Sequence, residues 1–295
     1  MDPIKIALTG VLAPAVLAGV ILAIAALVGR RAGAGLRELA APRWAGVALA
    51  AGFGLGFAFT LGWPALLPVD VTQVGPWAAV FAAPLGFLSG RLRAAATALL
   101  GVGLGLFLAG PTQSGGELVL TTALVTGAVV AMERGLALIG DEGRGGSLVS
   151  LVFVSGVAAV VLLSDTASLA VTTGGLAAGL GAMFTMSLVA PGLGVVSRAA
   201  PVLALVSATH LFATTLYASG SLGPVLILAV SPLVVALGVR ILRPGQGLKR
   251  ALIPAVLIGG TVGGAGAWAA SRYLAEEEAP AVDGGGSETP DDYGY

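Results

Sequence analysis

The sequence contains no cysteine, one histidine and few charged residues. The lack of cysteine excludes disulfides, thiolate metal sites and a cysteine nucleophile. A catalytic metal needs several histidine or carboxylate ligands together, and magnesium-bound phosphates need clustered aspartates; the apolar segments hold neither. We therefore expect no metal and no cofactor, and an enzyme is disfavoured.

Apolar residues dominate, with 57% hydrophobic and 10% charged residues, whereas globular proteins have about 25% charged residues. A membrane core about 30 Å thick is crossed by roughly 20 apolar helical residues. These continuous runs lack the alternation of a membrane β-barrel. We therefore predict an all-α, polytopic transmembrane helix bundle of about ten spans. The segments are 4–29, 44–62, 74–90, 94–110, 117–133, 146–164, 166–189, 200–219, 223–242 and 251–274.

The basic residues lie almost entirely in alternate loops. Thirteen of the fifteen follow the odd-numbered spans, at Arg30, Arg31, Arg37, Arg43, Arg91, Arg93, Arg134, Arg144, Arg198, Arg240, Arg243, Lys249 and Arg250. By the positive-inside rule, both termini lie on the non-cytoplasmic side. The first apolar run is longer than a signal-peptide core and precedes its basic cluster, which predicts a retained span. A composition rich in Ala, Gly and Arg is typical of GC-rich bacteria, so we expect a multi-pass protein of the bacterial inner (plasma) membrane.

We expect two regions, a transmembrane helical domain over residues 1–274 and an acidic tail over 275–295. The tail has seven acidic residues, no basic residue and a run of three glycines, which predicts a disordered, non-cytoplasmic segment. The alternative is a docking peptide anchored by Tyr293 and Tyr295. The loop from Met132 to Arg144 is expected to form a short interfacial helix.

The only histidine lies within an apolar run. At 100° per residue, Ser207, His210, Thr214 and Tyr217 form one polar stripe within about 80°. An ionisable group within a span marks a functional candidate. Two interpretations remain open: a neutral histidine that binds a hydroxyl on a neighbouring helix, or a residue that lines a substrate path. No carboxylate lies within the spans, which disfavours ion-coupled transport.

Hydroxyls beside flexible backbone mark a second part of the tentative substrate path. Thr172 and Thr173 precede two glycines, and candidate helix breaks lie at Pro84–Gly86, Ala190–Gly192 and Ser231–Pro232. Interrupted helices form the binding sites of many carriers. The alternative is structural, because proline and glycine are common in membrane helices.

Glycines recur at every fourth position in several spans, which predicts close helix packing because small residues let backbones approach. The predicted packing residues are Gly52, Gly56, Gly101, Gly105, Gly175, Gly179, Gly259 and Gly263.

Two functions fit this pattern. The first is a permease or flippase for a small neutral, zwitterionic or amphipathic solute. The alternative is a non-catalytic membrane subunit or assembly factor of a larger membrane complex. Membrane protein partners or a homo-oligomer are compatible with the sequence in either case. The lipid bilayer is the expected environment of either. The basic residues are spread over short loops, so we expect no nucleic-acid partner.

Overall fold

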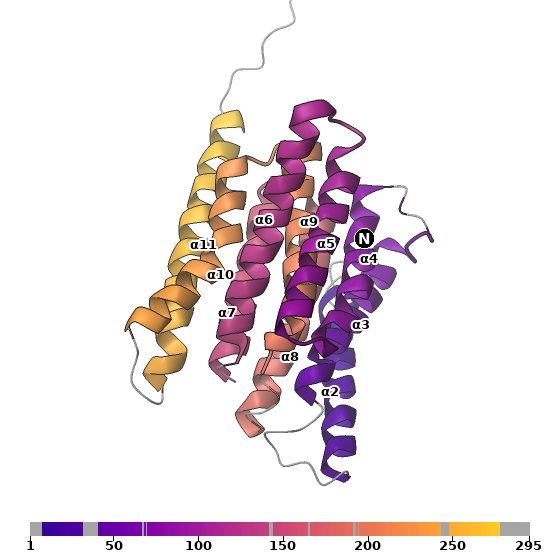
Figure 1. Cartoon of the computed structure of the whole chain (residues 1–295), viewed down its shortest axis with the longest axis vertical. Coiled ribbons are helices and arrows are strands. Elements are labelled where there is room, and N and C mark those ends of the chain that lie inside the picture. The colour runs from indigo at the N-terminus through magenta and orange to yellow at the C-terminus, as the bar shows by residue number, and fades with distance from the viewer. Residues whose placement is uncertain are drawn as a thin grey trace, which may run out of the picture.

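The computed structural model describes residues 8–31, 41–66, 68, 70–141, 144–164, 166–190, 193, 195–242 and 248–277. These residues form helices and no strand. Nine of the helices in this part of the chain are long and apolar enough to cross a membrane. The protein is therefore an all-α, polytopic membrane helix bundle, as the sequence predicts (Figure 1).

The helices follow the predicted spans closely. A π-helical turn η1 (Leu8–Leu12) leads into α2, and short 3₁₀ helices flank α4 and precede α9. The elements are α2 (Ala13–Arg31), α3 (Ala41–Leu61), η2 (Val71–Gln73), α4 (Val74–Ala82), η3 (Ala83–Phe87), α5 (Gly90–Ala109), α6 (Gly115–Gly140), α7 (Arg144–Leu162), α8 (Ala167–Val189), η5 (Ser197–Ala199), α9 (Ala200–Tyr217), α10 (Leu222–Leu242) and α11 (Leu248–Glu277).

The predicted third span, 74–90, is α-helical only over its first nine residues. Pro84 lacks the N–H that would continue the α-helical ladder, and the chain continues as the 3₁₀ helix η3. A 3₁₀ helix rises about 2.0 Å per residue against about 1.5 Å in an α-helix, so the 3₁₀ and α segments from Val71 to Phe87 extend roughly 30 Å. A short sequence thereby reaches the length of a membrane crossing.

Helix α6 continues through the segment that we predicted as a loop with a separate interfacial helix. Hydropathy marks a span end at Glu133 and Arg134, yet Glu133 is buried and paired with Arg93. Leu136 and Ile139 are buried as well. The prediction was wrong here, because the ion pair and the apolar contacts remove the reason for the helix to end.

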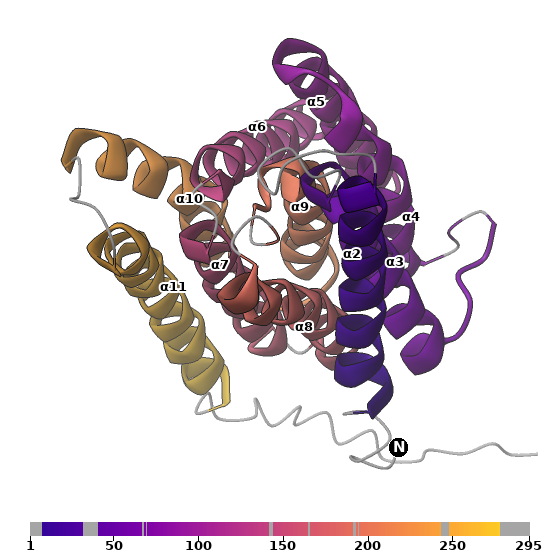
Figure 2. The same cartoon turned by 90° about the horizontal axis from the view of Figure 1, so that it is seen from below.

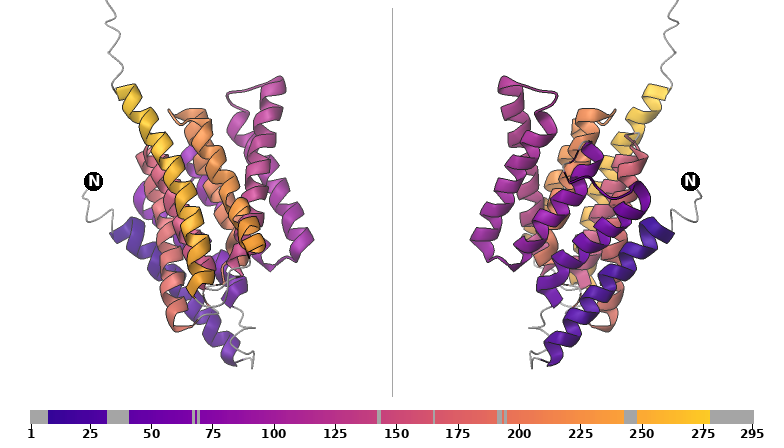
Figure 3. Two further views of the ribbon diagram at one scale, coloured as in Figure 1. Left: turned by 90° about the vertical axis from the view of Figure 1, so that its left-hand side faces the viewer. Right: turned by 90° about the vertical axis from the view of Figure 1, so that its right-hand side faces the viewer.

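Helix α9 lies in the centre of the bundle (Figure 2). Every residue from Ala200 to Thr214 is buried. Helices α3 to α8 all contact α9, while α11 packs outside α7 and beside α10. The side views show α10 and α11 as a peripheral pair (Figure 3). Three residues of the polar stripe, Ser207, His210 and Thr214, are therefore shielded from lipid, whereas Tyr217 at the end of α9 is exposed.

Successive helices alternate in direction, so that α2, α6, α8 and α10 end at the bottom of Figure 1. We call this the basic end, since the arginine-bearing helix ends gather there. Arg144 donates to the Ser187 carbonyl oxygen over 2.7 Å, and Arg198 donates to the Leu88 carbonyl oxygen over 2.8 Å. Cations at helix C-termini satisfy free carbonyls and oppose the negative end of the helix dipole. These arginines thus have a structural role besides the orientation predicted from sequence.

The C-terminal helix α11 extends to Glu277, three residues past the expected domain boundary at 274. The rest of the predicted tail, including Tyr293 and Tyr295, lies outside the described residues. At the predicted Ala190–Gly192 break, α8 ends and Ala190 is extended, while residues 191 and 192 lie outside the described residues. Pro232 is accommodated inside a continuous α10.

Candidate functional site

The central polar contact joins His210 of α9 to Thr173 of α8. The Nδ1 atom of His210 lies 2.6 Å from Thr173 Oγ1, and both side chains are fully buried. Thr173 also donates its proton to the Leu169 carbonyl oxygen over 2.7 Å. With that proton committed, the imidazole donates from Nδ1, and Nε2 becomes an acceptor. The hydroxyl partner expected on a neighbouring helix is therefore Thr173.

The Nε2 atom of His210 has no hydrogen-bond partner among the described residues. It faces Gly75 in the first turn of α4, where a Cβ atom would lie 2.7 Å from Nε2. The Phe53 ring lies beside the imidazole, with ring centroids 5.9 Å apart and ring planes tilted by 44°. A side chain at position 75 would therefore force α4 away from α9.

The other residues of the predicted path take no part in this contact. Thr172 donates to Leu169 O and Thr214 to Leu211 O, each within its own helix. Ser207 is buried, and its Oγ atom has no partner among the described residues. Tyr217 lies at the far end of α9, half-exposed, and donates to the Leu108 carbonyl oxygen over 2.6 Å. The structure thus brings His210 and Thr173 together and spreads the remaining four residues along the bundle.

An apolar cleft opens between α4 and α5, with a volume of about 380 Å³. The α4 residues on this side include Trp77 and Phe81, and Leu205 of α9 lies at its inner side. Phe81 is 57% exposed, so the cleft opens sideways to where lipid would lie. The lining is Leu66, Pro68, Val74, Trp77, Ala78, Phe81, Leu100, Gly103, Leu104, Phe107 and Leu205.

A second cavity of about 480 Å³ adjoins the cleft at the end of the bundle opposite the basic end. Pro68 and Phe107 line both spaces. Asp70 and Tyr217 give the second cavity its polar character, and the Asp70 carboxylate accepts from Thr72 N at the start of η2. An apolar space that continues into a polar one fits an amphipathic molecule.

Helix α4 separates the cleft from the polar contact. Its residues Val74, Ala78 and Phe81 line the cleft, whereas Gly75 lies against His210. The cleft was not predicted from the sequence, although the aromatic residues Trp77 and Phe81, four positions apart in the third predicted span, and the Pro84–Gly86 break that follows them are visible there.

At the basic end, Glu133 forms the one buried ion pair among the described residues. Arg93 Nε lies 2.9 Å from Glu133 Oε1, but the N–H does not point at that oxygen, so the contact is ionic and not a directed hydrogen bond. Arg93 also donates to the Ser197 carbonyl oxygen over 3.3 Å. The described residues contain no group of three possible metal ligands.

The predicted packing glycines divide into two groups. A Cβ atom at Gly52 would lie 2.7 Å from Pro14 O, and one at Gly105 would lie 2.8 Å from Thr122 Cα. Such distances require glycine because the neighbouring atoms belong to backbone. Gly56, Gly101, Gly175 and Gly179 also lie against neighbouring helices, whereas Gly259 and Gly263 of α11 have no atom within 4 Å of a Cβ position.

No protein-family model and no curated protein matches this chain. The cleft, its polar neighbour and the His210–Thr173 contact are therefore the features from which a function is inferred.

Proposed function

We propose that this protein is a bacterial inner-membrane permease or flippase for an amphipathic solute, with both termini outside the cytoplasm. The cleft between α4 and α5 is the observation that carries the proposal. Ligand sites in proteins are typically concave, largely apolar spaces of about 300–1,000 Å³ with a few polar groups. The cleft of about 380 Å³ and the adjoining cavity of about 480 Å³ fall within this range.

The apolar part of the solute would enter the cleft sideways from the lipid, and its polar part would lie near Asp70 and Tyr217. Desolvating a charged head group in the apolar cleft would be costly. The adjoining cavity offers such a group the Asp70 carboxylate and the Tyr217 hydroxyl. The lining therefore favours a solute with a zwitterionic or cationic head.

Helix α4 is the element whose movement would connect the two sides of the site. One face lines the cleft and Gly75 lies against His210. The helix has nine residues, and its α-helical ladder ends before Pro84. A displacement of α4 would expose the His210–Thr173 contact to a solute in the cleft, in keeping with carriers built around interrupted helices.

The test reconstitutes the purified protein into liposomes that contain fluorescent NBD-phosphatidylcholine and measures bleaching by external dithionite. Lipid movement makes probe from the inner leaflet accessible, so the bleached fraction should exceed that of protein-free liposomes. Equal fractions would contradict movement of this lipid.

A matched pair of variants assigns the activity to the cleft. Gly103 lines the cleft and Gly127 lies on α6, and a Cβ atom at either position meets nothing within 4 Å. Gly103→Phe should fill the cleft and slow probe movement at least about tenfold, as expected when a binding pocket is occluded. Gly127→Phe should leave the rate unchanged. Equal rates for both variants would remove the cleft from the transport path.

One observation favours the alternative, a non-catalytic subunit of a membrane complex. Gly259 and Gly263 of α11 have no neighbouring atom within 4 Å of a Cβ position, and small residues on an open helix face permit close helix contact. Extraction of the tagged protein in mild detergent, followed by mass spectrometry, distinguishes the two. A stoichiometric partner lost with Gly263→Leu would support the subunit role, whereas the protein alone or as a homo-oligomer would support transport.

A further inference from the structure

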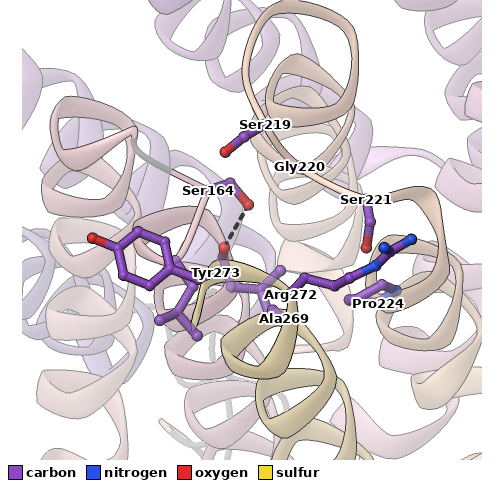
Figure 4. A pocket seen from close by; sticks show the side chains of 10 residues that line it. Ser164, Ser219, Gly220, Ser221, Pro224, Ala269, Arg272 and Tyr273 are labelled. Atoms are coloured by element: carbon purple, nitrogen blue, oxygen red, sulfur yellow. Dashed lines mark hydrogen bonds between the residues drawn. The ribbon is translucent and has the colours of Figure 1, made fainter. Parts of the chain in front are cut away.

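A small polar pocket lies between the end of α7, the turn from α9 to α10, and the end of α11 (Figure 4). It shares no residue with the cleft or the cavity described above. Its volume of about 10 Å³ holds a single water-sized atom. Its polar lining is made by Ser164, Ser219, Ser221, Arg272 and Tyr273.

Arg272 departs from the charge pattern of the molecule. Among the described residues it is the one basic residue at the end opposite the basic end, and within them its guanidinium has no ion pair. Arginine binds carboxylate and phosphate oxygens through a planar fork of N–H donors. A free guanidinium beside a pocket of this size therefore favours an anionic ligand with more than one oxygen.

The hydroxyl groups around the pocket divide into donors and acceptors. Figure 4 shows the Arg272 guanidinium beside the Ser221 hydroxyl, with Ser164 and Ser219 on the other side of the space. Ser164 is buried, and its proton is committed to the Val160 carbonyl oxygen over 2.9 Å. Ser219 and Ser221 have no hydrogen bond within the described residues. Both hydroxyls can therefore donate to the same anion as Arg272.

The position of the pocket along the membrane normal indicates the source of the anion. Trp268 and Tyr273 lie on the same turns of α11 as Arg272, and both are partly exposed. Exposed Trp and Tyr at the end of a membrane helix mark the level of the lipid head groups. Arg272 thus lies at the depth of the phospholipid phosphates.

We propose that Arg272, Ser219 and Ser221 form a phosphate-binding site for a phospholipid head group of the non-cytoplasmic leaflet. One phosphate oxygen enters the pocket, and the remaining oxygens accept from the guanidinium. The site is independent of the cleft and of the transport role proposed above. Its failure would leave that role unaffected.

The test uses the full-length protein, purified in detergent and stripped of lipid, with two probes. Phosphatidylglycerol retained per protein is measured by native mass spectrometry, and inorganic phosphate binding is measured by isothermal titration calorimetry. Arg272→Gln should weaken phosphatidylglycerol binding at least about tenfold, the loss expected on removing a charge-assisted fork. Arg272→Lys should recover part of the affinity, because it keeps the charge and loses the planar fork.

Arg240→Gln is the matched control, since Arg240 is an exposed arginine near the opposite end of α10. The site is assigned to a lipid head group if the protein binds phosphatidylglycerol but not inorganic phosphate, and if Arg272→Gln loses this binding while Arg240→Gln keeps it. Binding of both probes with the same variant pattern supports the phosphate site but shows that a lipid is not required. Equal binding by the wild type and Arg272→Gln would overturn the proposal, as would a wild-type protein that binds neither probe.

Discussion

His210 and Gly75 meet so closely that an alanine methyl group at position 75 would lie 2.7 Å from His210 Nε2. Both positions lie at the contact between α9 and α4, and this contact sets how near the short helix comes to the centre of the bundle. The size of one side chain therefore controls the position of the element that lines the cleft.

Gly75→Ala should destabilise the protein by about 1–3 kcal/mol through overpacking. In a His210→Ala background the same change should cost much less, because the clashing atom is gone. The coupling between the two positions should therefore be about 1 kcal/mol or more. Thermal unfolding in detergent provides the four measurements. Additive effects would show that the two residues do not press on each other.

Neighbouring glycines of α5 should respond oppositely to alanine. At Gly105 the new Cβ atom would lie 2.8 Å from Thr122 Cα, whereas at Gly103 it meets nothing within 4 Å. Gly105→Ala should lower stability by about 1–3 kcal/mol. Gly103→Ala should raise it by up to about 1 kcal/mol, because alanine is the better helix former. Unfolding midpoints of the two purified variants test this, and a similar loss in both would contradict the packing described for α5 and α6.

The ion pair between Glu133 and Arg93 should be costly to break from one side. Arg93→Ala leaves the buried Glu133 carboxylate with only the exposed Arg134, whose Nε lies 3.7 Å from Oε2, and should cost up to about 3–5 kcal/mol. The double variant Arg93→Leu/Glu133→Leu should lose less than the single variant, since no buried charge remains unpaired. Arg91→Ala changes an exposed arginine of the same helix and serves as the control. A loss in Arg91→Ala as large as in Arg93→Ala would argue against the ion pair as the cause.

The orientation of the chain can be tested at the two ends of α5. Ser89 and Ser114 are both exposed and lie just before and just after this helix. The chain has no cysteine of its own, so each serine-to-cysteine variant carries one thiol. An impermeant maleimide added to intact spheroplasts should label Ser114→Cys, and Ser89→Cys only after permeabilisation. The reverse result would place both termini in the cytoplasm.

Hydropathy and charge predicted nearly every helix, because a helix that crosses the membrane needs a long apolar run whether it faces lipid or, like α9, the centre of the bundle. The same criterion failed at Glu133, where burial in an ion pair lets a charged residue continue a helix. It also did not show that the third span is α-helical only in part. A 3₁₀ helix needs fewer residues than an α-helix to cover the same length. The hydropathy of single residues contains neither the pairing of a buried charge nor the rise per residue of the helix.

The candidate site was predictable only in part. The helical period placed His210 on a polar stripe, and Thr173 was named separately as a hydroxyl beside two glycines. Periodicity shows which face of a helix is polar, but it does not show which residue of another helix contacts that face. The cleft depends on how far α4 and α5 separate, which is a property of packing between helices. The apolar residues that line it, such as Leu100 and Leu104, are indistinguishable in the sequence from core residues.

The central position of α9 bears on the order in which the protein assembles. A helix that is buried from Ala200 to Thr214 has little contact with lipid in the finished bundle, yet it follows α2 to α8 in the chain and so enters the membrane after them. Those seven helices must leave a lateral opening until α9 arrives. Helices α10 and α11, made last, pack against α6 and α7. Truncation before α9 would therefore leave an unfilled ring, whereas truncation after α9 would leave its central helix in place.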